Sequence, residues 1–288
     1  METLICMAFD NLSSNDQLKI RKGLRQIEGL LAQICLSSPS AEKRRSIVEY
    51  GKEPSPPRPL DQLTDDPAFL QFFKLQNGFE CNIISRLLNC LDRLLGKAQE
   101  GTYDLLIIQT LDLCQGVMLL HPPSRSLFAR EAYMEQLLDL LEPVNCPAIQ
   151  STTIITLVCA LIDTPKNTRT FEKLEGLLVV TSIFKSRETT REVKLKLVEF
   201  LYFYLMPETP SIPTANSTVS VPQMLQRSPS KLAGAFNRVD TNRKRSDSGS
   251  DITKTTEEKQ FLLGRFLNSV DELVADLRES TPFGGAVC

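Results

Sequence analysis

Apolar residues recur at helical spacing along most of this sequence, most clearly in four segments. Within each segment the large apolar side chains stand mostly three or four positions apart, so they would share one face of an α-helix. They include Leu105, Ile108, Leu111 and Met118 in the first segment, Leu127, Tyr133, Leu137 and Leu141 in the second, Phe171, Leu174, Leu177 and Ile183 in the third, and Val193, Leu197, Phe200 and Tyr204 in the fourth. The pattern predicts one helix in each segment.

Residues that break helices separate these segments at intervals of about 21 residues. The breaks are at Gly101, Pro122 and Pro123, Pro143, Pro165, the polar residues 185–187, and Pro207. Helices of about 15–18 residues would then pair into units of about 42, the period of HEAT and armadillo arrays. Individual residues do not repeat clearly between units. The rhythm predicts an all-α, armadillo/HEAT-like helical repeat (an α-solenoid), with an irregular helical bundle as the alternative.

Two more helical regions precede these segments. Ser14 or Asn15 can cap a helix whose apolar stripe is Leu18, Leu24, Ile27, Leu31 and Ile34. After a polar, proline-rich loop at 37–59, an apolar segment begins at Pro67, breaks at Asn77 and Gly78, and is followed by a stripe from Ile83 to Leu95. We therefore assign residues 1–206 to one helical-repeat domain.

The chain changes character after this domain. Of the 50 residues in 207–256, 20 are Ser, Thr or Pro, so this segment is predicted to be a disordered linker. Order is expected to resume in 257–288, where an apolar stripe predicts an amphipathic helix and a tail. The stripe consists of Leu263, Phe266, Leu267, Val270, Leu273, Val274 and Leu277. We expect this helix to dock on the helical domain, with insertion into a partner as the alternative.

Composition and motifs argue against catalysis. The 288 residues are 42% hydrophobic and 24% charged, with a formal charge of −2, so no concentrated basic surface attracts nucleic acid. The one histidine, His121, stands in a His-Pro-Pro turn, where a turn or capping role is expected. Phosphate-binding loops, kinase elements, the cysteine-phosphatase Cys-x5-Arg pattern and metalloprotease motifs are absent. We predict a non-enzyme without cofactor, metal or small-molecule substrate.

The cysteines and the N-terminus predict the compartment. The eight cysteines form no CxxC pair, and several, such as Cys90 and Cys114, stand in apolar helical stretches, so free core thiols are expected. The N-terminus lacks a secretory signal pattern. The long uncharged run 143–162 is interrupted by polar residues and prolines, which favours a buried helix over a membrane span. We expect an intracellular, soluble protein without membrane insertion.

Two sets of residues are candidates for interaction or regulation. On the predicted helix 188–205, Arg191, Lys194 and Lys196 form a candidate partner-binding face, with an ordinary solvated surface as the alternative. In the linker, Ser228 precedes Pro229, and Ser246 and Ser248 follow a basic run. Both patterns suit protein kinases, and phosphates there would make a positively charged tether negative.

Several segments resemble one known family. They are FFKLQNGFECN at 72–82, NTRTFEKLEGL at 167–177, KLKLVEFLY at 194–202, and LLG at 262–264 with TPFG at 281–284. These segments resemble the fungal cell division control protein fourteen family, a component of the septation initiation network (SIN). The family is distinct from the like-named dual-specificity phosphatase of budding yeast.

The resemblance implies a non-catalytic regulatory or scaffold subunit. Such a subunit would bind a Ste20-type, germinal-centre-class protein kinase and promote septum formation and cytokinesis. It would act in the cytoplasm and, during mitosis, at the spindle pole body. No catalytic residues carry over. The alternative function is a helical-repeat adaptor of another complex, in transport or assembly, without a kinase partner.

Overall fold

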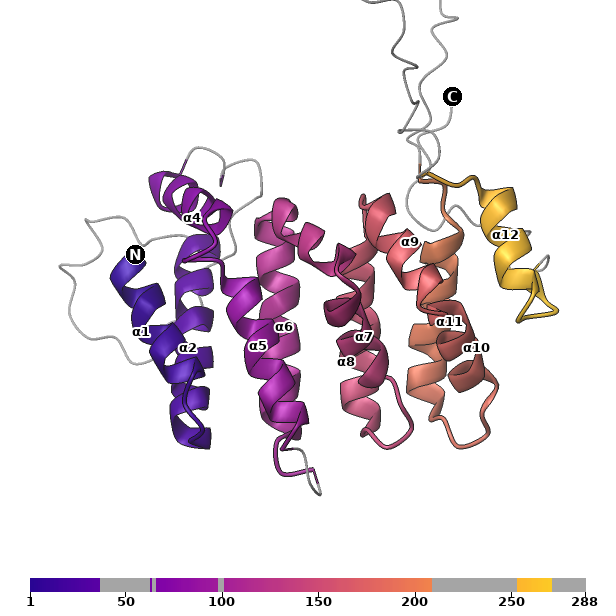
Figure 1. Ribbon diagram of the computed structural model, residues 1–288, viewed down its shortest axis with the longest axis horizontal. Coiled ribbons are helices and arrows are strands. Elements are labelled where there is room, and N and C mark those ends of the chain that lie inside the picture. The colour runs from indigo at the N-terminus through magenta and orange to yellow at the C-terminus, as the bar shows by residue number, and fades with distance from the viewer. Residues whose placement is uncertain (37–62, 64–65, 98–100, 209–252, 271–288) are drawn as a thin grey trace, which may run out of the picture.

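The computed structural model describes residues 1–36, 63, 66–97, 101–208 and 253–270 (Figure 1). These residues form helices, turns and loops, and no β-strand occurs among them, which confirms the all-α prediction. The helices are α1 (Glu2–Leu12), α2 (Gln17–Cys35), α4 (Pro67–Asn77), α5 (Ile83–Leu95), α6 (Asp104–Leu120), the 3-10 helix η2 (Pro122–Ala129), α7 (Glu131–Asp139), α8 (Pro147–Leu161), α9 (Pro165–Lys173), α10 (Gly176–Lys185), α11 (Arg191–Leu205) and α12 (Thr256–Gly264).

The helices pack in two layers. Helices α2, α6, α8 and α11 contact one another in succession and form one layer, while α1, α5, η2 with α7, and α9 with α10 lie over it (Figure 1). The core lies between the layers, where Leu87, Leu111, Leu157 and Leu201 are fully buried. Most residues at the predicted stripe positions are buried, such as Leu111 and Leu137, but Leu105 is 71% exposed. The arrangement is compatible with a helical-repeat solenoid.

The breaks fall where the sequence predicts them, but two segments predicted as single helices are each divided. The segment after Pro122 divides at Arg130, whose extended backbone ends η2 before α7 begins. The segment after Pro165 divides at Glu175, which is in the left-handed region at φ 57°. A Cβ on Gly176 would lie 2.2 Å from the ring of Phe171, so glycine is required at this corner.

The N-terminal helices also differ in detail from the prediction. Asp16, rather than Ser14 or Asn15, caps α2 by accepting a hydrogen bond from the Leu18 backbone N–H. Leu18 is exposed, and Ile20 takes its place in the buried stripe. Helix α1 was not predicted because its apolar pattern is only about three turns long, and it packs along α2.

The C-terminal helix is shorter than its sequence pattern predicts. Helix α12 ends at Gly264, and the chain turns over residues 265–269 instead of continuing as a helix, which corrects the prediction. Helix α12 packs against α11 at the end of the array (Figure 1). Its Leu263, and Leu267 and Val270 after it, are buried. The rest of the predicted stripe, Leu273, Val274 and Leu277, lies outside the described residues.

Candidate protein-docking groove

An apolar groove of about 850 Å³ opens between α8 and α11. Its lining is mainly aliphatic and aromatic and includes Ile155 and Val158 from α8 and Phe203 and Met206 from the end of α11. Ile155 is 39% exposed, which is unusual for a large aliphatic residue in the middle of a core helix.

The two helices present the groove because each leaves apolar side chains partly uncovered beside its buried residues. On α11, Phe200 and Tyr204 are buried against the array, while Phe203 is half-buried beside them. On α8, Ile154 is buried and its neighbour Ile155 is left at the open surface. Such a site favours binding of apolar groups, because their transfer out of water is favourable.

Charged residues lie along both edges of the groove. On the α11 edge, Lys196 Nζ lies 2.8 Å from Glu199 Oε2. On the α8 edge, Asp163 has a left-handed backbone at φ 53°, and its Oδ2 lies 3.9 Å from Nη1 of Arg125. The Asp163 side chain is 87% exposed, so its carboxylate is available to solvent.

A cluster of ionised side chains closes one end of the groove. Glu208 is at its centre: its Oε1 lies 2.6 Å from Arg169 Nη2 and 3.0 Å from Lys259 Nζ. Its Oε2 accepts a hydrogen bond from the Lys254 backbone N–H at 2.8 Å. Glu208 and Lys259 are both almost fully buried, and burial lowers the pKa of Lys259.

A second carboxylate completes this ion cluster. Glu172 Oε2 lies 2.5 Å from Lys254 Nζ, and its Oε1 accepts a hydrogen bond from the Tyr204 hydroxyl at 2.8 Å. Burial and the adjacent Glu172 raise the pKa of Tyr204, so its hydroxyl stays a donor. Through these contacts, α9 and α11 hold residues 208 and 254, which flank the segment 209–252, at the same end of the groove.

The predicted binding residues on α11 do not form one face. Successive residues of a helix are about 100° apart, so Lys194 and Lys196 lie on opposite sides of the buried stripe. Lys196 lines the groove, Lys194 is half-buried away from it, and Arg191 is exposed in the first turn. A binding role for each residue stays a prediction. Ser228, Ser246 and Ser248 lie outside the described residues.

Sequence reasoning missed the groove residues Ile155, Phe203, Asp163 and Glu208. Only Asp163 had a local signal, because it stands between the end of an apolar run and Pro165. The others depend on which helices become neighbours, and that information is absent from local patterns.

His121 is a buried turn histidine, as predicted. Its Nδ1 lies 2.7 Å from Ser124 Oγ and its Nε2 lies 3.1 Å from Asn77 Oδ1. An amide oxygen only accepts, so Nε2 donates to it and Nδ1 accepts from the Ser124 hydroxyl. The ring also packs edge-on against Phe73, and burial lowers the pKa of His121. These contacts fully explain the histidine as part of the fold.

A neutral polar network surrounds His121 and coincides with the motif at 72–82. Gln76 donates to the Cys81 carbonyl and accepts from the Ile83 N–H, at 3.0 and 2.8 Å. Asn82 donates to the Gln76 carbonyl and to Ser124 Oγ, at 2.9 and 3.2 Å. This motif therefore fixes the corner between α4, α5 and η2.

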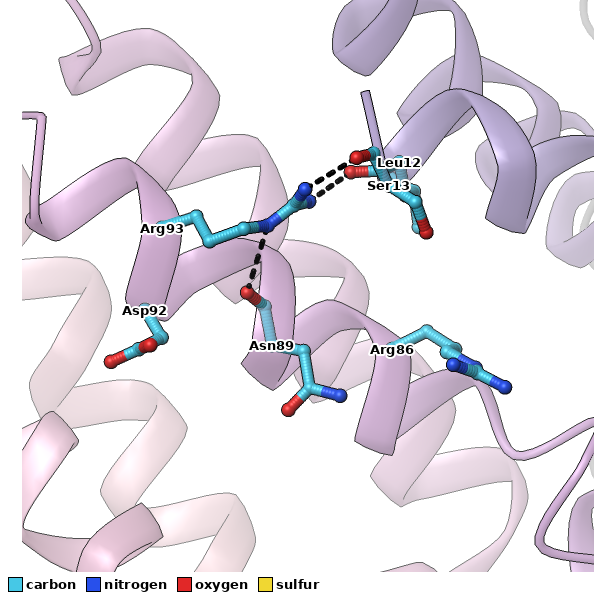
Figure 2. Close-up of a pocket in the computed structure, with 6 residues that line it drawn as sticks. All are labelled: Leu12, Ser13, Arg86, Asn89, Asp92 and Arg93. Carbon is cyan, nitrogen blue, oxygen red and sulfur yellow. Dashed lines mark hydrogen bonds between the residues drawn. The ribbon is translucent and has the colours of Figure 1, made fainter. Parts of the chain in front are cut away.

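A smaller pocket of about 310 Å³ lies between α1 and α5 (Figure 2). Figure 2 shows Arg93 reaching from α5 to the C-terminus of α1, where its guanidinium donates to the carbonyls of Leu12 and Ser13. Arg86 lies over the Phe9 ring at 5.4 Å from its centroid. Arg93 donates through Nη1 and Nη2 to α1 and through Nε to the Asn89 carbonyl of its own helix, so its polar groups are already paired. The larger groove is therefore the better candidate for binding.

The remaining candidate chemistry is structural. The cysteines in the described part of the chain are free thiols, and burial raises the pKa of Cys90 and Cys114, so these thiols are predominantly protonated at neutral pH. Within the described ranges, His, Cys, Asp and Glu residues form no group of three that is suited to a metal ion. No helix described in the structure is both long and apolar enough to cross a membrane.

The fold and the groove define the class: a two-layered all-helical protein with an open apolar surface between two helices. A family model described as "Cell division control protein 14, SIN component" matches residues 1–283. Cell division control protein 14 of Schizosaccharomyces pombe is 28% identical over 292 residues, which cover 99% of this chain and 97% of that protein.

The chain therefore belongs to the cell division control protein 14 family of SIN components, which confirms the resemblance found in the sequence. This family is not the like-named phosphatase, and membership supports a role in septation initiation. No solved structure matches the chain.

Proposed function

We propose that this protein is a non-catalytic regulatory or scaffold subunit that binds a Ste20-type, germinal-centre-class protein kinase in the septation initiation network. The observation that carries the proposal is the match to a SIN component over almost the whole chain, on both sides of residues 209–252. In this role the protein promotes septum formation and cytokinesis.

The groove between α8 and α11 supports the proposal because it offers a binding surface for another protein. It combines an apolar floor with charged edges, as the centres and rims of protein interfaces do. A helical array exposes such surfaces without needing an active site. We assign the kinase to this groove, with Lys196 at its edge.

Affinity purification tests this function. The tagged full-length protein is recovered from mitotic cells in about 0.3 M salt, roughly twice physiological ionic strength, and its partners are quantified by mass spectrometry. A Ste20-type kinase in stoichiometric amount is the expected result. Recovery of transport or assembly factors without a kinase would favour the alternative of an adaptor in another complex.

Localisation follows from the same role. The protein is expected in the cytoplasm and at the spindle pole body during mitosis. Fluorescence of the tagged chain through the cell cycle checks this, and a signal that never coincides with a spindle pole marker contradicts it.

Regulation by phosphorylation is proposed for the segment 209–252, which lies in the chain between Glu208 and Lys254 of the ion cluster. Residues 207–256 carry seven basic and four acidic residues, so phosphorylation of Ser228, Ser246 and Ser248 would reverse the sign of its charge. Phosphopeptide analysis of the mitotic protein checks the modification. A Ser→Ala variant at all three positions should alter kinase recovery, and unchanged recovery argues against a regulatory role.

A further inference from the structure

The groove is long enough for a short helix. Its walls, α8 and α11, lie side by side in one layer of the array (Figure 1). Lining residues extend from Lys196 to Met206 on the α11 side, which at 1.5 Å per residue corresponds to about 15 Å. A helix of about ten residues, nearly three turns, spans the same length.

The floor favours an apolar ridge on that helix. Ile155, Val158 and Phe203 offer only hydrocarbon to an occupant, and about 850 Å³ lies within the usual range for ligand pockets, about 300–1,000 Å³. At the closed end, Glu208 and Lys259 are ion-paired to each other and buried. They therefore present no unpaired charge to a bound segment.

The edges of the groove favour a bound helix that carries positive charge on either side of its apolar ridge. On the α8 edge, Asp163 is 87% exposed, and Arg125, at 3.9 Å, also donates to backbone carbonyls. On the α11 edge, the Glu199 side chain is 56% exposed, whereas its partner Lys196 is 33% exposed. On each edge the carboxylate is thus more exposed to a partner than the basic side chain beside it.

We propose that the groove binds a short amphipathic helix whose apolar ridge is flanked by Lys or Arg residues that face Asp163 and Glu199. The identity of its carrier, the kinase, rests on the proposed function; the chemistry of the segment follows from the groove. Its basic residues steer the encounter and fix the orientation, while the apolar ridge supplies most of the affinity.

Asp163 makes the proposal testable, because its backbone and its charge are separable. It follows the C-cap of α8 in the left-handed region, where glycine is the usual residue. Asp163→Gly should leave the folded protein as stable as before, or more so, since glycine adopts this conformation without strain. It nevertheless removes the carboxylate that faces the bound helix.

The first test identifies the occupant directly. A photo-crosslinking amino acid replaces Ile155 in the full-length chain, and the crosslinked peptide is sequenced after irradiation of mitotic cells. Leu178 on α10 is the matched control, because it is 43% exposed against 39% for Ile155 but lies outside the groove. We expect a kinase segment with helical apolar spacing and flanking basic residues from position 155 and not from 178.

The other outcomes separate the two proposals. A basic amphipathic segment of a protein other than a kinase would support the groove chemistry and overturn the assignment of the kinase to this groove. A crosslink to residues 209–252 or 271–288 of this chain, to a second copy, to an acidic or uncharged segment, or to nothing would overturn the groove proposal. Whether a kinase copurifies with the protein does not depend on which segment occupies the groove.

The second test measures the charge contribution. The double variant Asp163→Gly with Glu199→Gln should bind the copurifying kinase about fivefold more weakly at low salt, which corresponds to two rim pairs of ordinary strength. At about 0.5 M salt the difference should vanish because of screening. Glu192→Gln, an exposed change on the same helix outside the groove, should have no effect. Equal binding by the double variant and the unmodified chain would overturn the role of the edges.

Discussion

Two corners of the molecule bury polar groups in contrasting ways. The corner between α4, α5 and η2 uses neutral amides, hydroxyls and His121, which lie within about 50 residues of one another. The corner where α9, α11 and α12 meet uses charges, and it joins residues as distant as Arg169 and Lys259 through Glu208.

The contrast shows how differently the two corners depend on their members. A neutral network loses one or two hydrogen bonds when one member is removed. A buried ion cluster has already lost hydration, so the removal of Glu208 leaves Lys259 charged without its carboxylate, although Arg169 keeps Glu172 at 3.0 Å. The ion cluster therefore holds residues 253–270 in place, and the removal of one of its members should destabilise these contacts more than the loss of a single neutral hydrogen bond would.

The largest expected effect is at the centre of the ion cluster. Glu208→Ala leaves Lys259 and Arg169 without their shared carboxylate, and we expect a loss of about 3–5 kcal/mol in the contacts that hold α12. Hydrogen exchange of residues 253–270 should rise to the level of unprotected amides. The exposed Glu188→Ala is the control, and equal exchange in both variants would contradict the contrast.

A slightly smaller effect is expected where α9 meets α10. Gly176→Ala places a methyl group 2.2 Å from the Phe171 ring, and such overpacking costs about 2–3 kcal/mol. Gly29→Ala in α2 meets no atom within 4 Å and should stabilise the protein by about 0.5–1 kcal/mol. Urea denaturation of both variants checks the difference in sign. A stable Gly176→Ala protein would show that this corner adapts.

The neutral corner should be less sensitive than the ion cluster. Asn82→Ala removes donors to Gln76 and Ser124 and the cap of α5, with an expected cost of about 1–2 kcal/mol in the free energy of unfolding. Denaturant titration measures it. If Asn82→Ala lowered stability as much as Glu208→Ala does, the proposed difference between the two corners would be wrong.

The smallest effect is a pH dependence at His121. Burial lowers the pKa of His121, so below about pH 6.5 the unfolded chain binds the proton more readily than the folded one. The contribution of His121 to the free energy of unfolding is therefore at its maximum above pH 6.5 and falls as the pH drops towards the folded-state pKa. Denaturant titrations at pH 7.5 and 5.5 measure the free energy of unfolding. Its decrease between the two pH values should be smaller for His121→Gln than for the unmodified protein. Identical drops would place the pH response elsewhere.

The sequence predicted the helices well where each segment carries its own signal. The breaks at Pro122, Pro143 and Pro165 are correct because proline ends a helix through local geometry. The division at Glu175 was missed, since its apolar neighbours keep helical spacing across the corner. The left-handed backbone of Glu175 and the close approach of the Phe171 ring to Gly176 make this corner, and apolar periodicity reports neither.

The site was predicted only in part. Helix α11 was singled out, and Lys196 lies at the edge of the groove, but Arg191 and Lys194 lie elsewhere. The groove exists because α8 packs beside α11, a pairing between residues about 45 positions apart that no local pattern encodes. The ion cluster likewise depends on residues on both sides of 209–252.

The most direct test of the account compares two matched substitutions in the full-length protein. Ile155→Lys places a charge in the groove, and Leu178→Lys places one at a similarly exposed position on α10. Both variants should unfold at the temperature of the unmodified protein. Kinase recovered from mitotic cells should fall at least tenfold, about 1.4 kcal/mol, for Ile155→Lys only. Equal recovery with both variants would contradict the groove as the kinase-binding site.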